Sequence, residues 1–266
     1  MAERALLGVI GGSGLYHLLD GAEEVVMRTP YGPTSDVIHI GELSGHPTAF
    51  LARHGREHQL PPHLVPYRAN LWALREIGVR RVIAPAASGS LKPGVRPGDI
   101  VICDQFVDRT SGRADTFSEA GAVIHVSMAE PYCPALRSLA IQAARSLRIR
   151  AHPEGTVVVI QGPRFSTRAE SRWFADAGWS VVNMTQYPEV ALARELGLCY
   201  LNLSVVTDHD AGIPGDPSAP AVDARTVLEV LREGMGDARL VIAEVARGLS
   251  GAGPCDCAAL AERARI

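Results

Sequence analysis

Two aspartates close an apolar stretch of the chain. The run Ser204–Thr207 has the composition of a buried strand, and Asp208, His209 and Asp210 follow it directly. Residues just past a strand end can converge on one ligand. Burying a carboxylate there is costly unless a partner donates hydrogen bonds to it. An aminopurine can donate such bonds through its amino group and a protonated ring nitrogen. The pair therefore points either to base recognition and proton donation or to a plain turn cap.

Three further strand ends carry groups that suit an anion. The turn Gly11-Gly12-Ser13-Gly14 offers backbone amides and the Ser13 hydroxyl, and Arg53-His54 adds a planar guanidinium fork beside an imidazole. The small residues around Ala87 let backbone amides approach a ligand. The glycine turn lacks the third glycine of a dinucleotide fingerprint and the Gly-Lys-Ser/Thr of a triphosphate loop. Together these ends predict an anion site at the carboxyl edge of a sheet.

One alternative for the same segment is a metal site. His54-Gly55-Arg56-Glu57-His58 matches the H-x-x-E-H pattern of inverted zinc peptidases. That chemistry needs a helix with both histidines on one face, and Gly55 with the following Pro61-Pro62 supports a helix poorly. The absence of a G-x-S-x-G elbow disfavours an α/β-hydrolase. The sequence therefore disfavours both a zinc peptidase and an α/β-hydrolase.

The elements that must hold these ends alternate along the chain. We expect strands at Leu6–Ile10, Asp36–Ile40, Ala49–Ala52, Arg81–Ala84, Asp99–Ile102, Thr156–Ile160, Ser180–Met184 and Cys199–Thr207. We expect helices at Tyr67–Ile77, Pro134–Leu147, Arg168–Ala177, Pro188–Leu196 and, interrupted at Gly234 and Gly236, Asp223–Leu249. This alternation predicts an α/β fold with a mixed, mostly parallel central β-sheet flanked by helices.

Length and composition favour one domain. The 266 residues, of which 47% are hydrophobic, suit a domain over residues 1–250 and a C-terminal tail over 251–266. The Pro- and Gly-rich stretch Ala211–Pro220 is interpreted as a lid over the site or as a surface loop. Five cysteines without a secretion signal argue for free thiols. The tail's Cys255-Asp256-Cys257 is a weak zinc site on its own, and a strained disulfide stays open.

Charge and hydropathy narrow the class of partner. A net charge of −3 gives no electrostatic case for nucleic acid or a membrane surface. No stretch approaches the roughly 18 apolar residues of a membrane span, and the N-terminal apolar run is too short for a signal peptide. We expect a cytoplasmic protein that binds a small molecule.

Taken in order, the motifs resemble the S-methyl-5′-thioadenosine phosphorylases of the trimeric purine nucleoside phosphorylase family. The matching segments are Gly8–Gly14, Leu51–Gly55, Pro66–Leu74, Asp104–Thr110, Met128–Pro134, Gly162–Ser171, Asn183–Thr185 and Thr207–Asp210. The resemblance runs from about Gly8 to Leu249. It implies reversible phosphorolysis of methylthioadenosine to adenine and 5-methylthioribose 1-phosphate. It also implies a homotrimer or a dimer of trimers, with inorganic phosphate as co-substrate and no metal or other cofactor.

The resemblance also assigns residues to parts of the substrate. Phosphate would be held by Ser13, Arg53, His54, the Ala87 amide and Thr185, and the ribose by Met184. The base would contact Phe165 and Ser166, with Asp208 at N7 and Asp210 at the 6-amino group. The 5′ group would meet His125 of a neighbouring subunit, Ala224 and Val227. Asp208 and Asp210 are the candidate catalytic residues.

The chemistry of purine departure agrees with these roles. A purine is a poor anionic leaving group, so an acid with a raised pKa at N7 lowers the barrier, and bound phosphate stabilises a cationic sugar. Two aspartates favour a 6-aminopurine, because relatives that bind 6-oxopurines carry Asn at the first position. Relatives frequently carry other residues at the positions of Ala86, Ala224 and Gln161.

These departures leave the 5′ substituent open. The alternative is therefore a broader purine nucleoside phosphorylase acting on adenosine, inosine, methylthioinosine or another 5′-modified nucleoside. A non-catalytic purine- or phosphate-binding protein is the alternative of a different class.

Overall fold

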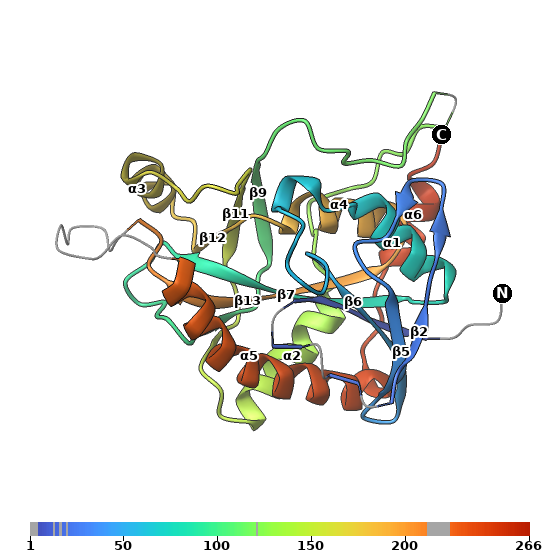
Figure 1. The fold of residues 1–266 in the computed structure, drawn as a ribbon, viewed down its shortest axis with the longest axis horizontal. Helices are drawn as coiled ribbons and strands as arrows, with labels where there is room; N and C mark the ends of the chain where they lie inside the picture. The colour runs from blue at the N-terminus through green and yellow to red at the C-terminus, as the bar shows by residue number, and fades with distance from the viewer. Residues whose placement is uncertain (1–4, 13, 16–17, 20, 121, 212–223) are drawn as a thin grey trace.

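The computed structural model describes residues 5–266 apart from 13, 16–17, 20, 121 and 212–223, and its centre is a large twisted sheet (Figure 1). Within the described residues, eleven strands join in this sheet. They are β1 (Leu7–Gly11), β2 (Glu23–Val25), β5 (Ile38–Leu43), β6 (His46–Ala52), β7 (Arg81–Ser90), β8 (Ile100–Val101), β9 (Gln105–Arg109), β10 (Ala151–His152), β11 (Thr156–Ile160), β12 (Val181–Asn183) and β13 (Cys199–Asp208). A separate two-stranded sheet pairs β3 (Arg28–Thr29) with β4 (Gly32–Pro33).

The pairing is mixed and mostly parallel, as the sequence predicts. The main path has the order β10-β8-β13-β7-β1-β6-β5-β2, and β13, β7, β1 and β6 are all parallel neighbours. The pairs β8/β13, β5/β6 and β2/β5 are antiparallel. At Gly89 and Ser90, β7 also pairs antiparallel with β12, from which β11 and β9 continue. The sheet therefore branches where β7 is longer than the predicted strand.

Helices cover both faces of the sheet. They are α1 (Tyr67–Glu76), α2 (Pro134–Ser146), α3 (Arg168–Asp176), α4 (Gln186–Glu195), α5 (Ala224–Arg247) and α6 (Cys257–Arg263), with short 3₁₀ turns η1 (Pro62–Leu64) and η2 (Gly248–Gly251). Figure 1 shows α2 and α5 on one face and α1, α4 and α6 on the other. One buried cluster includes Leu74 and Val190, and the other includes Leu136 and Ile242. Burial of apolar surface on both faces therefore holds the layers together.

The predicted interruption of the last long helix is wrong. α5 runs from Ala224 to Arg247 without a break. A Cβ on Gly234 would lie 2.7 Å from Cγ1 of Val205, so glycine lets α5 approach β13. The low helix propensity of glycine costs about 1 kcal/mol, and tertiary packing overrides it here.

Several short elements have no clear sequence signal. β2, β3, β4, β9 and β10 are short or polar, so the two-residue alternation is too brief to recognise. The predicted tail contains α6, whose Cys257 and Ala261 are buried. Most of the predicted lid, 212–220, and the predicted helix start at Asp223 lie outside the described residues. Within the described part of the chain, no helix has the length and apolarity to cross a membrane.

Candidate active site

A cavity of about 680 Å³ opens where the carboxyl ends of the central parallel strands meet. Each neighbouring strand brings one short group of residues to it. The lining includes Arg53 and His54 after β6, Ala86, Ala87, Ser88 and Gly89 of β7, Asn183, Met184 and Thr185 at the end of β12, and Thr207, Asp208 and Asp210 at the end of β13. Phe165 and, from α5, Val227, Leu231 and Met235 also line the cavity. The topology thus collects groups that lie far apart in the sequence.

Asp208 is a half-buried acid at the end of β13. Its Oδ2 accepts a hydrogen bond from Thr207 Oγ1 at 2.6 Å, and its Oδ1 accepts one from the Asp210 amide at 2.6 Å. Burial raises the pKa of Asp208 to about 6, although both hydrogen bonds act in the opposite direction. A Cβ on Gly89 would lie 3.0 Å from Asp208 Oδ1, so the strand beside the acid must be small. Asp208 can therefore exchange a proton near neutral pH.

Asp210 presents a buried acceptor atom to the cavity. Its residue is 4% exposed, and within the described residues its Oδ2 has no hydrogen bond of normal geometry. Burial raises the pKa of this carboxyl above its ordinary value, although the nearby Ser171 and Ser166 hydroxyls and the Ala211 amide act in the opposite direction. Its backbone lies in the left-handed region with φ of 47°, which turns the chain back after β13. A buried acceptor without a donor is what the amino group of a ligand can satisfy.

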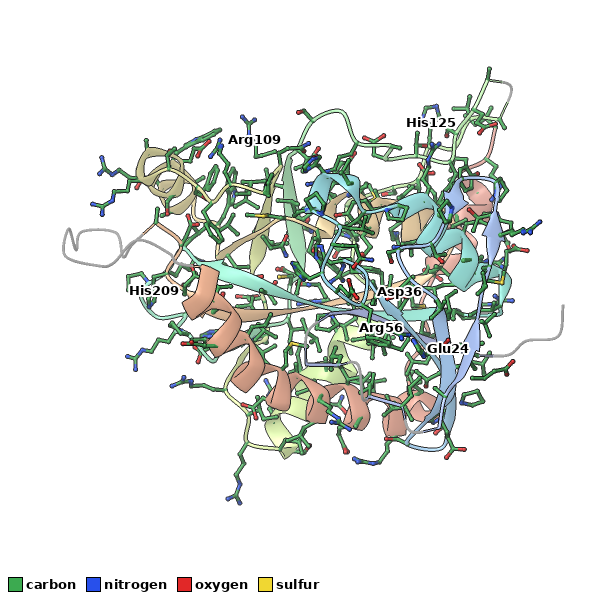
Figure 2. All side chains as sticks on the ribbon, viewed as in Figure 1. Glu24, Asp36, Arg56, Arg109, His125 and His209 are labelled. Carbon is green, nitrogen blue, oxygen red and sulfur yellow. The ribbon has the colours of Figure 1, made fainter. Side chains whose placement is uncertain are left out.

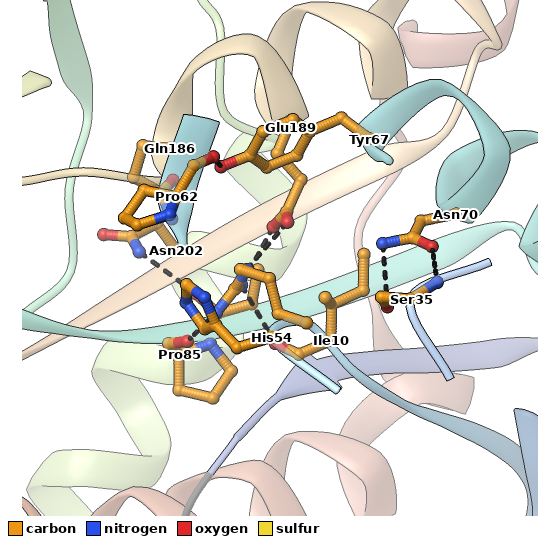
Figure 3. A network of polar contacts seen from close by, with 12 residues as sticks. Ile10, Ser35, His54, Pro62, Tyr67, Asn70, Pro85, Gln186, Glu189 and Asn202 are labelled. Atoms are coloured by element: carbon orange, nitrogen blue, oxygen red, sulfur yellow. Dashed lines mark hydrogen bonds and ion pairs between the residues drawn. The ribbon is translucent and has the colours of Figure 1, made fainter. Parts of the chain in front are cut away.

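Arg53 is held in a buried network with Glu189 of α4 (Figure 3). Its Nε and Nη2 donate to the two Glu189 carboxylate oxygens at 2.8 and 2.9 Å, and Nη1 and Nη2 donate to the Pro85 and Ile10 carbonyls at 3.0 Å each. Tyr200 donates to Glu189 at 2.6 Å. Within the described part of the chain, four of the five N–H groups of the guanidinium are therefore occupied, and one on Nη1 is left for a ligand.

His54 is neutral, and the lone pair of its Nε2 points away from the Leu60 carbonyl that Nδ1 contacts. Its Nδ1 lies 2.8 Å from the Leu60 carbonyl, which can only accept, so the proton is on Nδ1 and the lone pair on Nε2. Burial and the charge of Arg53 lower the pKa of His54 to about 4. In the cavity wall the Nε2 lone pair can accept a hydrogen bond from a partly protonated phosphate.

The zinc-peptidase alternative does not fit the backbone of this segment. Gly55 and His58 have φ of 76° and 56°, so residues 54–58 form turns rather than a helix. The rings of His54 and His58 stack at 4.6 Å instead of sharing a helix face.

Most of the predicted site residues meet in the cavity. Arg53, His54, Ala87, Phe165, Met184, Thr185, Asp208, Asp210 and Val227 all line it. Ser166 is adjacent to this wall, and its Oγ is buried with no partner in the described part of the chain. Ser13 and the side chain of Ala224 lie outside the described residues.

His125 is the exception. Figure 2 shows it across the molecule from His209, the neighbour of Asp208, so it cannot reach the cavity of its own chain. Its side chain is exposed, and its amide donates to the Ala264 carbonyl near the C-terminus at 2.8 Å.

Several residues of the site were not singled out in the sequence. Leu231 and Met235 follow Val227 at four-residue intervals, so helical periodicity could have found them. Glu189 stands inside an apolar helix, which marks a buried acid in need of a partner. Ser88 Oγ and Asn183 Nδ2 also lie at the cavity, buried and without a partner among the described residues.

Comparison with known proteins gives consistent matches over most of the chain. The family model of the phosphorylase superfamily matches residues 6–247. The chain is 48% identical to a purine nucleoside phosphorylase of Streptomyces coelicolor, over 96% of this chain and 92% of that protein. It is 57% identical to an S-methyl-5′-thioadenosine phosphorylase of Mycolicibacterium smegmatis, over 84% and 85%.

Solved structures agree with these matches. A methylthioadenosine phosphorylase from an Antarctic soil metagenomic library superposes with a TM-score of 0.92 at 40% identity, covering 99% of this chain and 93% of that one. The methylthioadenosine phosphorylase of Schistosoma mansoni in complex with adenine gives a TM-score of 0.91 at 36% identity, covering 98% and 99%.

Proposed function

The chain belongs to the phosphorylase superfamily, and from this premise we propose that it cleaves S-methyl-5′-thioadenosine with inorganic phosphate. The products are adenine and 5-methylthioribose 1-phosphate. The observation that carries the proposal is one cavity that combines the Asp208–Asp210 pair with Arg53 and His54. The first pair suits an aminopurine, and the second suits an anion.

Phosphate binding in this proposal relies on more than charge. Because Glu189 compensates Arg53, the guanidinium contributes one directed N–H and a modest net field. His54 Nε2 accepts a hydrogen bond from the hydroxyl of a monobasic phosphate, and the Ala87 amide and the Thr185 hydroxyl supply further hydrogen bonds. Thr185 precedes α4 and makes no capping hydrogen bond with its side chain. Phosphate is then fixed close to the sugar carbon that it attacks.

Bond cleavage separates the purine from a sugar that becomes cationic. The bound phosphate anion stabilises that cation and then forms the new bond to carbon, while the electrons of the glycosidic bond leave with the purine. Asp208, with a pKa of about 6, donates a proton or a hydrogen bond to N7 and so neutralises the departing base. Met184 packs against the ribose. The exchange of one bond for another involves no change of oxidation state, so the proposal requires no redox cofactor.

Selection of the base rests on Asp210. Its unpartnered Oδ2 accepts from the 6-amino group of adenine, whereas the carbonyl oxygen of a 6-oxopurine would face a carboxylate. At the 5′ end, Val227, Leu231 and Met235 present an apolar face of α5. An apolar wall favours a methylthio group over a hydroxyl, because only the hydroxyl loses hydrogen bonds with water there.

The proposal is tested by adenine release from methylthioadenosine with and without phosphate. We expect release only with phosphate, together with a sugar 1-phosphate. Adenine binding without any cleavage of a panel of nucleosides would instead identify a non-catalytic purine-binding protein.

A broader purine nucleoside phosphorylase is the second candidate. The 48% identity with the purine nucleoside phosphorylase of Streptomyces coelicolor over 96% of this chain favours it. Comparing kcat/KM on methylthioadenosine, adenosine, inosine and methylthioinosine separates the two. A preference for methylthioadenosine over the other three compounds supports the first candidate, and comparable rates on adenosine or on the 6-oxo compounds support the second.

We also propose that the protein is cytoplasmic and acts as a homotrimer or a dimer of trimers, in which His125 completes a neighbour's 5′ pocket. The support is the exposed position of His125 far from its own cavity. Light scattering measures the mass, and cell fractionation measures the location.

Subunit mixing tests the role of His125. Asp208→Ala and His125→Ala subunits should each be impaired and regain activity when co-expressed, because a mixed interface restores one intact site. A monomeric mass, or no recovery in proven mixed oligomers, would contradict the shared site.

A further inference from the structure

Four cysteines from three separate segments meet on the side of the fold away from the cavity. Cys133 precedes α2, Cys199 is the first residue of β13, and Cys255 and Cys257 belong to the C-terminal segment. Their four Sγ atoms all lie within 4.8 Å of one another, and the Sγ atoms of Cys199 and Cys255 are 3.4 Å apart. Cys103, the fifth cysteine, is buried elsewhere.

The spacing fits a tetrahedral ion better than disulfides. Four thiolates at about 2.3 Å from a zinc ion have their sulfurs about 3.8 Å apart. A disulfide joins two sulfurs at about 2.05 Å and leaves the other pair apart. Here each sulfur has three sulfur neighbours at similar range, and all four cysteines are free. The arrangement is that of one four-ligand cage.

The surroundings of the cage supply positive charge. Arg194 is 3% exposed and donates from Nη1 to the Cys257 Sγ at 3.4 Å. Within the described residues it forms no ion pair with a carboxylate, and its buried Nε has no partner. Zinc with four thiolates carries a net charge of −2, which a buried guanidinium partly compensates.

The cage also has a route for an ion to enter. Cys133 and Cys257 are buried, Cys199 is half-buried, and Cys255 is exposed. Soft thiolate ligands in a closed tetrahedral set select zinc over magnesium or calcium.

We propose that Cys133, Cys199, Cys255 and Cys257 bind one structural zinc ion that fixes the C-terminal segment to the body of the fold. From the sequence alone, only the weak Cys255-Asp256-Cys257 pair can be recognised, because the other two ligands come from distant segments. The expectation of no metal for the reaction itself is unchanged, since the cage lies at the opposite end of β13 from Asp208.

By fixing the C-terminal segment, the ion would also hold in place the loop that carries His125. In the fixed segment, the Ala264 carbonyl accepts from the His125 amide at 2.8 Å, and Arg265 pairs with Ile124 in a β-bridge.

The first test measures metal and thiols on the same sample. The full chain is purified with no polyhistidine tag, no added metal and no reductant. Plasma mass spectrometry should then find about one zinc per chain. After the same sample is unfolded in the presence of a chelator, a thiol titration should find five free thiols per chain. No metal with one free thiol would mean two disulfides and would overturn the proposal. No metal with five thiols, or iron in place of zinc, would also overturn it.

Paired variants locate the ion. Cys255→Ser changes an exposed ligand, and Cys103→Ser is the matched control outside the cage. We expect Cys255→Ser to lose zinc on dialysis against a chelator that leaves the parent and Cys103→Ser loaded, and to have a lower Tm. Cobalt(II) should give the visible absorption of a tetrahedral thiolate site in the parent and in Cys103→Ser but not in Cys255→Ser. Equal zinc retention in all three proteins would refute the assignment.

Discussion

The two ends of β13 carry two different kinds of site. Asp208, at the carboxyl end, borders an open cavity, whereas Cys199, at the amino end, belongs to the cysteine cage. A ten-residue strand separates them by about 30 Å. At the cavity, buried polar atoms such as Asp210 Oδ2 have no hydrogen-bond partner among the residues that the structure describes. At the cage, the ligands face one another. The carboxyl end of β13 therefore suits a substrate that binds and leaves, and the amino end suits a metal ion that stays bound.

Two buried arginines, Arg53 paired with α4 and Arg194 within α4, show the same contrast. Arg53 and Arg194 are each 3% exposed. Arg53 has a bidentate carboxylate partner, whereas Arg194 faces the sulfur of Cys257 and the Ser127 carbonyl. Because burying an uncompensated charge is costly, the fold supplies a counter-charge for Arg53 itself, and the proposed zinc thiolates supply it for Arg194.

Removing the acid at the cavity should produce the largest effect. We expect Asp208→Ala to lower kcat/KM by about 10²- to 10⁴-fold, because proton donation to the leaving purine is lost. Zinc content and Tm should stay those of the parent, since the cage lies at the other end of the strand. Asp176→Ala, at an exposed position, is the control. Near-parental turnover of Asp208→Ala would reject the role of this acid.

Breaking the Arg53 pair should be next in size. Glu189→Gln keeps the shape of the side chain but leaves Arg53 buried without a counter-charge, so we expect a loss of about 3–5 kcal/mol in the free energy of unfolding. Urea denaturation measures it, and the exposed Glu76→Gln is the matched control. A loss below about 1 kcal/mol would show that solvent or phosphate compensates Arg53 instead.

The neutral state of His54 predicts a pH dependence of stability. Because its folded-state pKa is lowered from 6.5 to about 4, the unfolded chain binds the proton first as the pH falls. Its contribution to stability should therefore decrease by about 2 kcal/mol between pH 7 and pH 5.

The difference between parent and His54→Gln isolates this term. Asp208 contributes with the opposite sign in the same window, because its raised pKa makes the folded state take up a proton first. Asp208 is present in both proteins, so its term cancels. Parallel curves for the two proteins across this pH range would contradict a neutral, buried His54.

The smallest expected effect is at the 5′ end of the cavity. Val227→Ala removes apolar surface, and we expect the preference for methylthioadenosine over adenosine to fall by about tenfold. The ratio of the two kcat/KM values measures it. Leu240→Ala, on an exposed part of α5, should leave the ratio unchanged. An unchanged ratio in Val227→Ala would remove this side chain from the 5′ pocket.

The cavity was largely predictable because its residues follow strands. Arg53 and Asp208 stand directly after apolar runs, and parallel strands bring such ends to one edge. Glu189 was not predictable as the partner of Arg53, because the two residues lie 136 positions apart. The cage was missed for the same reason, since its ligands come from three segments.

The fold class followed from the alternation of strands and helices, but the branch at β7 did not. Residues 85–90 contain no β-branched side chain, so local propensity gives no strand there. The strand extends because β13 pairs with it on one side and β12 on the other.

The contact of Gly234 with Val205 has a consequence for how substrate range can change in evolution. The backbone of α5 already lies against β13 at the closest approach that glycine permits. With any larger residue at position 234, either the Val205 side chain or α5 would have to shift, and α5 carries Leu231 and Met235 of the cavity wall. A lineage could therefore accommodate bulkier nucleosides through one substitution that touches no ligand, at the expense of packing beneath the sheet.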